Sequence, residues 1–237
     1  MRTFLLLLAL SFSSPLLQAE TPFLQSEIDI VKAKNRAKAS PEKLVAYADG
    51  IEAVRKAAVV DSAKTVDDKA PDFTLPTVNG SSLTLSEELK KGPVVLTWYR
   101  GRWCPYCNIQ LAAYQKILPQ IEELGAQLIA VSPELPDKSL STTEKNNLRF
   151  TVLSDANLKV ADEYGLIFKL TPEVERLYGQ FFDIREFNGT EAVANELPLA
   201  ATYVIGQDGV IRWAFLEADY TMRAEPRDIL KALDALE

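Results

Sequence analysis

The feature that most constrains this chain is its pair of cysteines, Cys104 and Cys107, the only two in the sequence. An apolar, β-prone run at residues 93–98 precedes the pair. Behind it, residues 109–118 carry apolar side chains at the spacing of one helix face. Pro105 suits the first turn of such a helix, because its missing N–H would have no partner there anyway. The sequence therefore places both thiols where a buried strand passes into a helix.

This position favours redox chemistry. Unpaired backbone N–H groups and the positive end of a helix stabilise a thiolate relative to a thiol. Arg100 and Arg102 add positive charge close to the pair. Because thiol–disulfide exchange proceeds through the thiolate, the pattern predicts a redox-active dithiol. We expect the lower thiol pKa at Cys104, which lies nearer to the helix start than Cys107.

Two other uses of the cysteines fit less well. A structural disulfide closing so short a loop is worth only on the order of 2 kcal/mol, against about 4.7 kcal/mol for a loop of about 100 residues. A metal centre would need further ligands, and the chain has no histidine and no second cysteine pair. The absence of histidine also excludes Ser-His and Cys-His catalysis. We therefore expect redox chemistry with neither a metal nor an organic cofactor.

The run R-G-R-W-C-P-Y-C-N at residues 100–108 resembles the peroxiredoxin-like branch of the AhpC/TSA family, which carries C-x-x-C where peroxiredoxins have one peroxidatic cysteine. The resemblance covers about residues 66–237. It implies an α/β, thioredoxin-like fold, with a central mixed sheet flanked by helices. It also implies that the two cysteines cycle between dithiol and disulfide. Three further stretches resemble the family, at residues 69–76, 139–148 and 197–205.

The resemblance leaves the order of attack open. When the aromatic residues before the motif are aligned with those of peroxiredoxins, Cys107 takes the peroxidatic position. Arg100 then stands where the family has a proline, and Cys104 stands where it has a threonine. Ala200 replaces a later arginine, so the residues that polarise the peroxide bond are missing from their usual places. An alignment with thioredoxin instead makes Cys104 the attacking thiol and Cys107 the resolving one.

We interpret the chain as an exported thiol-dependent oxidoreductase, of the thiol peroxidase type that the resemblance implies. The alternative is a thioredoxin-like protein disulfide oxidoreductase without peroxidase activity. A third interpretation is a non-enzymatic interaction module whose cysteines form an inert staple. In the first two cases a peroxide or a disulfide is the substrate. A thiol electron donor, either a thioredoxin-like protein or a small thiol, then resets the pair.

Several residues near the thiols are candidates for supporting roles. Arg100 and Arg102 either orient a peroxide and stabilise a thiolate, or are ordinary surface charges. Trp103 and Tyr106 either form an apolar lip that selects the substrate, or belong to the core. Acidic residues that follow predicted strands, where α/β sheets often place ligand-binding loops, are candidates for a base: Glu134, Glu144 and Asp155.

Residues 1–19 are predicted to be a secretory signal peptide. Arg2 supplies the positive start, residues 4–10 are apolar, and Ala19 provides a small residue at the cleavage site. The apolar run is too short to cross a bilayer, so we expect no membrane span. Export to the periplasm or the medium implies an oxidising compartment, in which the dithiol either is kept reduced by a partner or acts as an oxidant.

The remainder divides into two parts. Residues 20–64 show two helical patterns, the second beginning at Ser40, and form a helical extension that either packs on the domain or contributes to a homodimer contact. Residues 65–237 form the thioredoxin-like domain. A basic cluster at residues 32–38 is interpreted as a solvated helix face. The net charge of −7 argues against nucleic acid or an anionic membrane as a partner.

The domain alternates strand and helix patterns. Asn79 and Gly80 indicate a hairpin turn, Pro119 should interrupt and kink the helix after the cysteines, and residues 187–195 are predicted as a loop. Strands are expected at residues 73–75, 82–85, 127–132, 150–153, 202–205 and 210–215. Helices are expected at residues 86–91, capped by Ser86, at 141–147, 157–164 and 223–236, and after Thr171.

Overall fold

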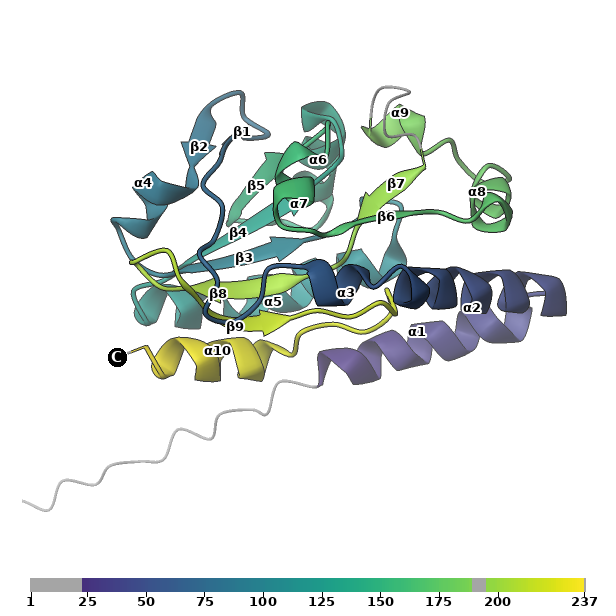
Figure 1. Cartoon of the computed structure of the whole chain (residues 1–237), viewed down its shortest axis with the longest axis horizontal. Helices are drawn as coiled ribbons and strands as arrows, with labels where there is room; N and C mark the ends of the chain where they lie inside the picture. The colour runs from purple at the N-terminus through teal and green to yellow at the C-terminus, as the bar shows by residue number, and fades with distance from the viewer. Residues whose placement is uncertain (1–22, 189–194, 237) are drawn as a thin grey trace, which may run out of the picture.

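A computed structural model describes residues 23–188 and 195–236 of the chain (Figure 1). The predicted signal peptide at residues 1–19 lies outside these ranges, as does most of the loop predicted at residues 187–195. Within the described ranges, no helix is both long and apolar enough to cross a membrane. The described chain forms one central sheet between helices, and a helical extension precedes this domain.

A mixed five-stranded sheet lies at the centre, with the strand order β5-β4-β3-β8-β9. β3 pairs in parallel with β4, and β4 pairs in parallel with β5, whereas β8 and β9 join on the other side in antiparallel orientation. This is the mixed sheet that the sequence predicts. Its strands are Val94–Trp98 (β3), Gln127–Ser132 (β4), Thr151–Ser154 (β5), Thr202–Ile205 (β8) and Ile211–Phe215 (β9).

The central strand β3 is buried along its whole length and directs alternate side chains to opposite faces of the sheet. Val94, Leu96 and Trp98 belong to the core on one face. Val95, together with Tyr99 just after the strand, belongs to the core on the other face. This burial on both sides explains why the sequence of β3 is a continuous apolar run rather than an alternating one.

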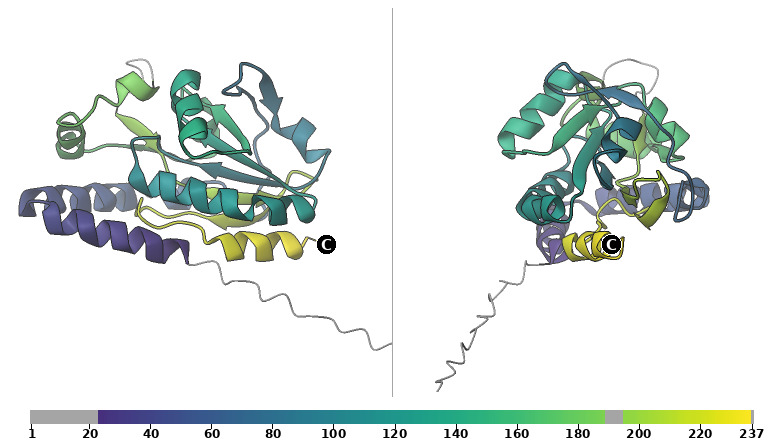
Figure 2. Two further views of the ribbon diagram at one scale, coloured as in Figure 1. Left: turned by 180° about the vertical axis from the view of Figure 1, so that it is seen from behind. Right: turned by 90° about the vertical axis from the view of Figure 1, so that its left-hand side faces the viewer.

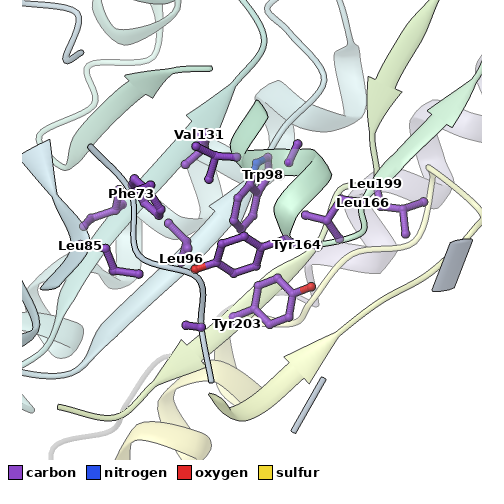
Figure 3. Close-up of a cluster of buried hydrophobic side chains, with 14 of the residues drawn as sticks. Phe73, Leu85, Leu96, Trp98, Val131, Tyr164, Leu166, Leu199 and Tyr203 are labelled. Atoms are coloured by element: carbon purple, nitrogen blue, oxygen red, sulfur yellow. The ribbon is translucent and has the colours of Figure 1, made fainter. Parts of the chain in front are cut away.

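The first core is built around aromatic rings (Figure 3). The centroid of the Trp98 ring lies 4.8 Å from that of Tyr164 and 5.9 Å from that of Tyr203. Short elements close this face of the sheet. They are α3 (Val59–Ser62), β1 (Thr74–Pro76), β2 (Ser82–Thr84), α4 (Leu85–Leu89) and α7 (Lys159–Glu163).

Two helices cover the other face, α5 (Pro105–Glu123) and α10 (Pro226–Asp234). α5 begins directly after the loop that follows β3, and the C-x-x-C motif lies at the start of this helix. Pro119 lies inside α5 and does not end it, since the helix continues to Glu123. The expected interruption at Pro119 is therefore wrong.

The N-terminal extension consists of α1 (Leu24–Lys38) and α2 (Pro41–Lys56). α1 contacts α5 and lies nearly in line with α10, while α2 contacts α8 (Figure 2). The Ser40 hydroxyl accepts a hydrogen bond from the backbone N–H of Lys43 at 3.3 Å and so caps α2, as the sequence predicts. The extension thus packs on the domain of its own chain, and the homodimer contact stays a prediction.

The remaining elements depart more from expectation. β1 and β2 form one two-stranded sheet. A second one, β6 (Ile167–Lys169) with β7 (Glu196–Pro198), was not predicted, because its strands are too short to show an alternation of apolar and polar residues. Ser86 does not cap α4, because its side chain and backbone N–H bind the Asp72 carboxylate instead. The remaining helices of the described chain are α6 (Pro136–Lys145), α8 (Pro172–Tyr178) and α9 (Arg185–Asn188).

Candidate active site

Cys104 and Cys107 lie together at the start of α5. Cys104 is the N-cap residue, and the backbone N–H of Cys107 in the first turn points at the Cys104 Sγ, 3.4 Å away. Pro105 is the first residue of the helix, as the sequence predicts. Both cysteines are free thiols, with exposed fractions of only 2% and 0%. The strand-to-helix junction therefore brings the two sulfur atoms together inside the protein rather than at its surface.

A buried arginine that the motif does not contain lies beside the pair. The Nη2 of Arg223, from the loop before α10, is 3.6 Å from the Cys107 Sγ. Arg223 is 2% exposed, and its Nε donates to the Gln110 side-chain oxygen at 2.6 Å. Its Nη1 donates to the backbone carbonyls of Tyr220 and Met222. These fixed acceptors hold the guanidinium group against the sulfur of Cys107.

A chain of hydrogen bonds connects Arg223 to the sheet. Gln110, on α5, donates from its amide to the Thr97 hydroxyl at 3.0 Å. Thr97 on β3 in turn shares a 2.8 Å hydrogen bond with the hydroxyl of Thr202 on β8. Because α5, β3 and β8 all contribute, the arginine is positioned by the rigid centre of the fold.

Arg100 is a second buried cation near the thiols. It follows β3 and is 1% exposed, and its guanidinium group lies 4.4 Å from the Tyr220 ring centroid and 5.0 Å from that of Trp103. One of its nitrogens donates to the Tyr178 hydroxyl, whereas its Nε has no hydrogen-bond partner within the described residues. Arg100 therefore belongs to the site, not to the solvated surface.

The two thiols have different acidities. Burial raises the pKa of both, but at Cys107 the hydrogen bond with Cys104 and the positive charges of Arg223 and Arg100 together bring the pKa below its ordinary value. At Cys104, burial and the neighbouring Cys107 keep the pKa well above that value. The expectation of a lower pKa at Cys104 is therefore wrong, because Cys104 acts as the hydrogen-bond donor that stabilises the Cys107 thiolate, and the neighbouring Cys107 charge opposes ionisation of Cys104.

Arg102 is held at the site by its backbone only. Its N–H donates at 2.8 Å to the carboxylate of Glu134, which also accepts from the hydroxyls of Thr142 at 3.3 Å and Tyr99 at 3.4 Å. The Arg102 side chain is exposed and lies over the ring of Phe187, 5.7 Å from its centroid. Of the two predicted arginines, the structure thus places only Arg100 against the thiols.

The three candidate bases lie in different surroundings. Glu134 is fully buried, and burial raises its pKa to about 7 despite its hydrogen bonds. Asp155 accepts the backbone N–H groups of Val160 and Ala161 at the start of α7, so it fixes that helix. Glu144 is exposed on α6. Glu134 alone adjoins the loop that carries the thiols.

Trp103 and Tyr106 lie on either side of Cys104 and pack against other aromatic rings. The half-buried Trp103 stacks on Phe182 with ring centroids 4.9 Å apart. Tyr106 is buried, 5.9 Å from the ring of Tyr220. Both side chains, and Cys104 between them, line a pocket of about 650 Å³, so the two residues belong to the core and to the wall of this pocket.

A mixed sheet whose central strand leads into a helix that starts with C-x-x-C is the architecture of thioredoxin-like thiol proteins. The sequence model of the AhpC/TSA family matches residues 66–214. The chain belongs to the AhpC/TSA family. The matched segment begins after α1, α2 and α3, so the helical extension precedes the part of the chain that the family defines.

Curated relatives are named as peroxiredoxins. The putative peroxiredoxin bcp of Coxiella burnetii (strain RSA 493 / Nine Mile phase I) is 28% identical over 156 residues, which cover 65% of this chain and 91% of that protein. Peroxiredoxin Bcp of Escherichia coli (strain K12) is 27% identical over 99 residues, which cover 42% of this chain and 63% of that protein.

Solved structures are similar in fold. Peroxidoxin BcpB from Mycobacterium tuberculosis aligns with a TM-score of 0.57 at 22% identity, covering 73% of this chain and 98% of that chain. A peroxiredoxin-like protein from Aquifex aeolicus also has a TM-score of 0.57, at 18% identity, covering 75% and 91% of the two chains. These likenesses confirm the predicted thioredoxin-like α/β fold.

Sequence reasoning missed Arg223 and Gln110. Arg223 lies 116 positions from Cys107, and no local motif marks it. One observation indicated that an arginine from elsewhere in the chain was needed, namely that Ala200 stands where the family has an arginine. A thiolate buried in the protein needs a cation from somewhere, so an arginine among apolar neighbours late in the chain was the residue to seek.

Proposed function

We propose that this protein is a thiol peroxidase in which Cys107 attacks the peroxide and Cys104 resolves the product. The observation that carries this proposal is the contact between the Cys107 sulfur and the buried guanidinium group of Arg223, at 3.6 Å. A thiolate is the nucleophile in such reactions, and a fixed cation both favours the thiolate and stabilises the negative charge that develops on the departing oxygen. Arg223 would thereby perform the function of the family arginine, at whose position this chain has Ala200.

The reaction proceeds in three balanced steps. The Cys107 thiolate attacks the terminal oxygen of ROOH, the O–O bond breaks, and RO⁻ leaves and takes a proton to give ROH. Cys107 is now a sulfenic acid. The Cys104 thiol attacks the Cys107 sulfur, forming the disulfide and releasing water. Two thiols of an external donor then reduce the disulfide and are themselves oxidised to a disulfide.

Cys104 has two roles in this cycle, as a hydrogen-bond donor to the Cys107 thiolate and as the resolving thiol. In the reduced enzyme its thiol is hydrogen-bonded to the Cys107 sulfur, at the position where the resemblance places a threonine. Because its pKa is raised, Cys104 retains its proton at neutral pH and stabilises the thiolate as a donor. It also lies at the wall of the aromatic pocket, in front of the fully buried Cys107. A peroxide entering the pocket therefore meets Cys104 first, and it reaches Cys107 only if the Cys104 side chain moves.

Burial of both sulfur atoms favours a peroxide over a protein disulfide as the substrate. Exchange with a protein disulfide requires a sulfur that another protein can approach in line, and in this reduced form neither thiol has more than 2% of its surface exposed. A protein donor would likewise require the oxidised pair to become accessible, whereas a small thiol could enter the pocket. A peroxide group is small enough to enter the pocket. We therefore favour the peroxidase over the thioredoxin-like oxidoreductase.

The rate of oxidation by hydrogen peroxide tests this proposal. Stopped-flow mixing of the reduced protein with peroxide should change the Trp103 fluorescence at a rate orders of magnitude above that of free cysteine. A sulfenic acid probe should label Cys104→Ser, which retains Cys107, but should not label Cys107→Ser. A rate close to that of free cysteine would contradict a peroxidase. Labelling of Cys107→Ser alone would reverse the roles of the two cysteines.

We also propose, from residues 1–19, that the chain is exported and works in the periplasm or the medium. A thiol donor of that compartment, either a thioredoxin-like protein or a small thiol, would then reduce the disulfide. Fractionation of the native host followed by N-terminal sequencing should find the mature protein outside the cytoplasm, beginning near Glu20. A chain that stays in the cytoplasm with Met1 intact would contradict export.

A further inference from the structure

The pocket at Cys104 is built largely by the N-terminal extension, which precedes the part of the chain that matches the family. α1 and α2 form one side, and the loops after β3, α8 and β9 form the other. Its volume is about 650 Å³, far more than hydrogen peroxide requires. The extension thus adds a chamber that is shaped for a larger molecule.

The wall of the pocket is aromatic. Trp103 stacks on Phe182, Phe182 stacks on Tyr178 with centroids 5.5 Å apart, and Tyr178 lies 6.2 Å from Tyr47 of α2. Rings from the extension and from the domain therefore form a continuous surface that ends at Cys104. Such a surface favours the apolar body of a ligand, because its burial removes apolar area from water.

The pocket is also strongly basic, although the whole chain carries a net charge of −7. Asp219 is the acidic residue among those that line it, and it pairs with Lys32 at 3.4 Å. Arg36, Lys38 and Lys43 have no ion-pair partner within the described part of the chain, whereas Arg100 compensates the thiolate. The cations that line the pocket are Lys32, Arg36, Lys38, Lys43 and Arg100.

Lys43 is one of the basic residues of the pocket and also lies against its aromatic wall. Its Nζ lies 4.4 Å from the centroid of the Phe181 ring and 5.8 Å from that of Tyr47, so its charge is held at the edge of the aromatic wall. Arg36 and Lys38 project from the end of α1 at the same rim. The basic cluster that the sequence suggested to be a solvated helix face is exposed in part, and three of its residues, Lys32, Arg36 and Lys38, line the pocket from the side of α1.

We propose that this pocket binds an organic hydroperoxide that carries a carboxylate on an apolar body. The apolar body would lie on the aromatic wall and the carboxylate at the basic rim. The hydroperoxide group would then point inward to Cys104, Arg100 and the Cys107 behind them. A polar peptide thiol matches the basic rim but not the aromatic wall, and a neutral alkyl peroxide matches the wall but not the rim. This proposal rests on the proposed peroxidase function and assigns its substrate class.

A matched pair of substrates tests it in the full chain as the host produces it. Cumene hydroperoxide is the neutral probe, and the same compound with a carboxylate on the ring is the charged probe. We expect kcat/KM to be about tenfold higher for the charged probe at low salt. That ratio should decrease as salt is added, because screening shortens the reach of the lysine charges.

The double substitution Lys38→Gln with Lys43→Gln should bring the ratio of the two kcat/KM values close to one. The ratio is the readout, so a general loss of activity does not imitate the effect. Lys231→Gln, which removes an exposed charge from α10 far along the chain, is the matched control and should leave the ratio unchanged.

The two proposals fail differently. If the protein reduces neither hydrogen peroxide nor either organic probe, the peroxidase function is wrong. If it reduces hydrogen peroxide rapidly but treats both organic probes alike, the function stands and the substrate class is overturned. A charged-probe preference that survives the double lysine substitution would also overturn it, since the selectivity would then arise elsewhere.

Discussion

At the scale of single residues, the acidity of Cys107 depends on Arg223, from outside the C-x-x-C motif, as well as on Cys104 within it. The Cys107 sulfur is buried, and burial by itself would keep a thiol protonated. The hydrogen bond with Cys104, the Arg223 guanidinium group 3.6 Å away and Arg100 together reverse this preference. Gln110 keeps Arg223 in place through a 2.6 Å hydrogen bond. The acidity of Cys107 is therefore a property of contacts between distant parts of the chain.

The substitution Arg223→Ala should raise the pKa of Cys107 and slow its oxidation. In the native protein the second-order rate with hydrogen peroxide should be half-maximal well below the ordinary thiol pKa of about 8.5. In the variant the midpoint should move toward or above 8.5. The rate at pH 7 should fall about 10²-fold, which is the usual loss for a donor that stabilises developing charge. Stopped-flow rates across pH measure both effects.

Arg223→Lys is the matched variant. It keeps the positive charge but loses the guanidinium N–H groups that donate to Gln110 and to the backbone carbonyls. It should lie between the native protein and Arg223→Ala in both midpoint and rate. An unchanged pH midpoint in Arg223→Ala would mean that Cys104 and Arg100 set the acidity of Cys107 without Arg223.

At the scale of elements, the start of α1 is capped by a residue from the far end of the chain. Phe23 offers no side-chain cap, and the Glu225 carboxylate accepts the backbone N–H groups of Leu24 and Gln25, each at 2.9 Å. A carboxylate there both satisfies unpaired donors and faces the positive helix end. One side chain thus connects the N-terminal extension to the closing helix α10.

Glu225→Ala should lower the free energy of unfolding by about 1–2 kcal/mol, the usual cost of losing a helix cap. Glu225→Gln, which keeps an acceptor but loses the charge, should cost less. Urea denaturation followed by circular dichroism measures the change. The exposed Glu217 offers a control, since Glu217→Ala should stay within about 0.5 kcal/mol of the native protein. Equal effects at both positions would contradict a capping role.

Glu134 connects the loop after β4 to the loop that carries the thiols, and it does so as a buried carboxylate. Its pKa is raised to about 7, so the folded state holds its proton more tightly than the unfolded state does. The resulting stability is complete below the unfolded pKa of about 4.3 and is lost as the pH rises through 7.

Glu134→Gln should therefore become more stable relative to the native protein as the pH rises from about 5 to about 8. The gain over this range should not exceed about 3 kcal/mol, somewhat less than the full equivalent of the pKa shift, because part of the shift is expressed below pH 5. Urea midpoints of both proteins at several pH values give the difference. A difference that stays constant with pH would show that Glu134 does not titrate in this range.

At the scale of the whole molecule, the extension and the domain enclose the redox pair between them. α1 contacts α5, α2 contacts α8, and the pocket opens between these helices at Cys104. The charge of the reduced site is compensated inside this enclosure by Arg223 and Arg100. Oxidation to the disulfide removes the anion and leaves two buried guanidinium groups without it, which is unfavourable.

We expect this loss to exceed the roughly 2 kcal/mol that a disulfide closing so short a loop contributes, so the reduced protein should unfold at a higher denaturant concentration than the oxidised protein. A thiol whose pKa is lowered by folding contributes most above its unfolded pKa of about 8.5, and this contribution is lost as the pH falls through the folded value. Cys104 stays protonated in this window because its pKa is raised. The difference should thus widen with rising pH up to about 8.5, as measured by denaturation with and without a reductant.

An oxidised form more stable than the reduced form at pH 8 would contradict this account. The Cys107→Ser variant provides the control, because it lacks the anion and the disulfide. Its stability should not depend on the reductant.

The local patterns of the chain determined much of this architecture. The apolar run before Cys104, the proline at position 105 and the helical spacing beyond it define the strand, the helix start and the place of both thiols. The resemblance around residues 100–108 extends this to the mixed sheet. These features depend on neighbours in sequence, which is why periodicity and capping residues reveal them.

The tertiary structure decided what the site does with that framework. It selected Cys107 as the more acidic thiol, brought Arg223 to it from 116 positions away, and turned the Arg102 side chain out toward Phe187. It also folded the basic end of α1 over the site as the rim of a pocket. Charges and burial act through space rather than along the chain, and no local pattern encodes which distant groups will meet.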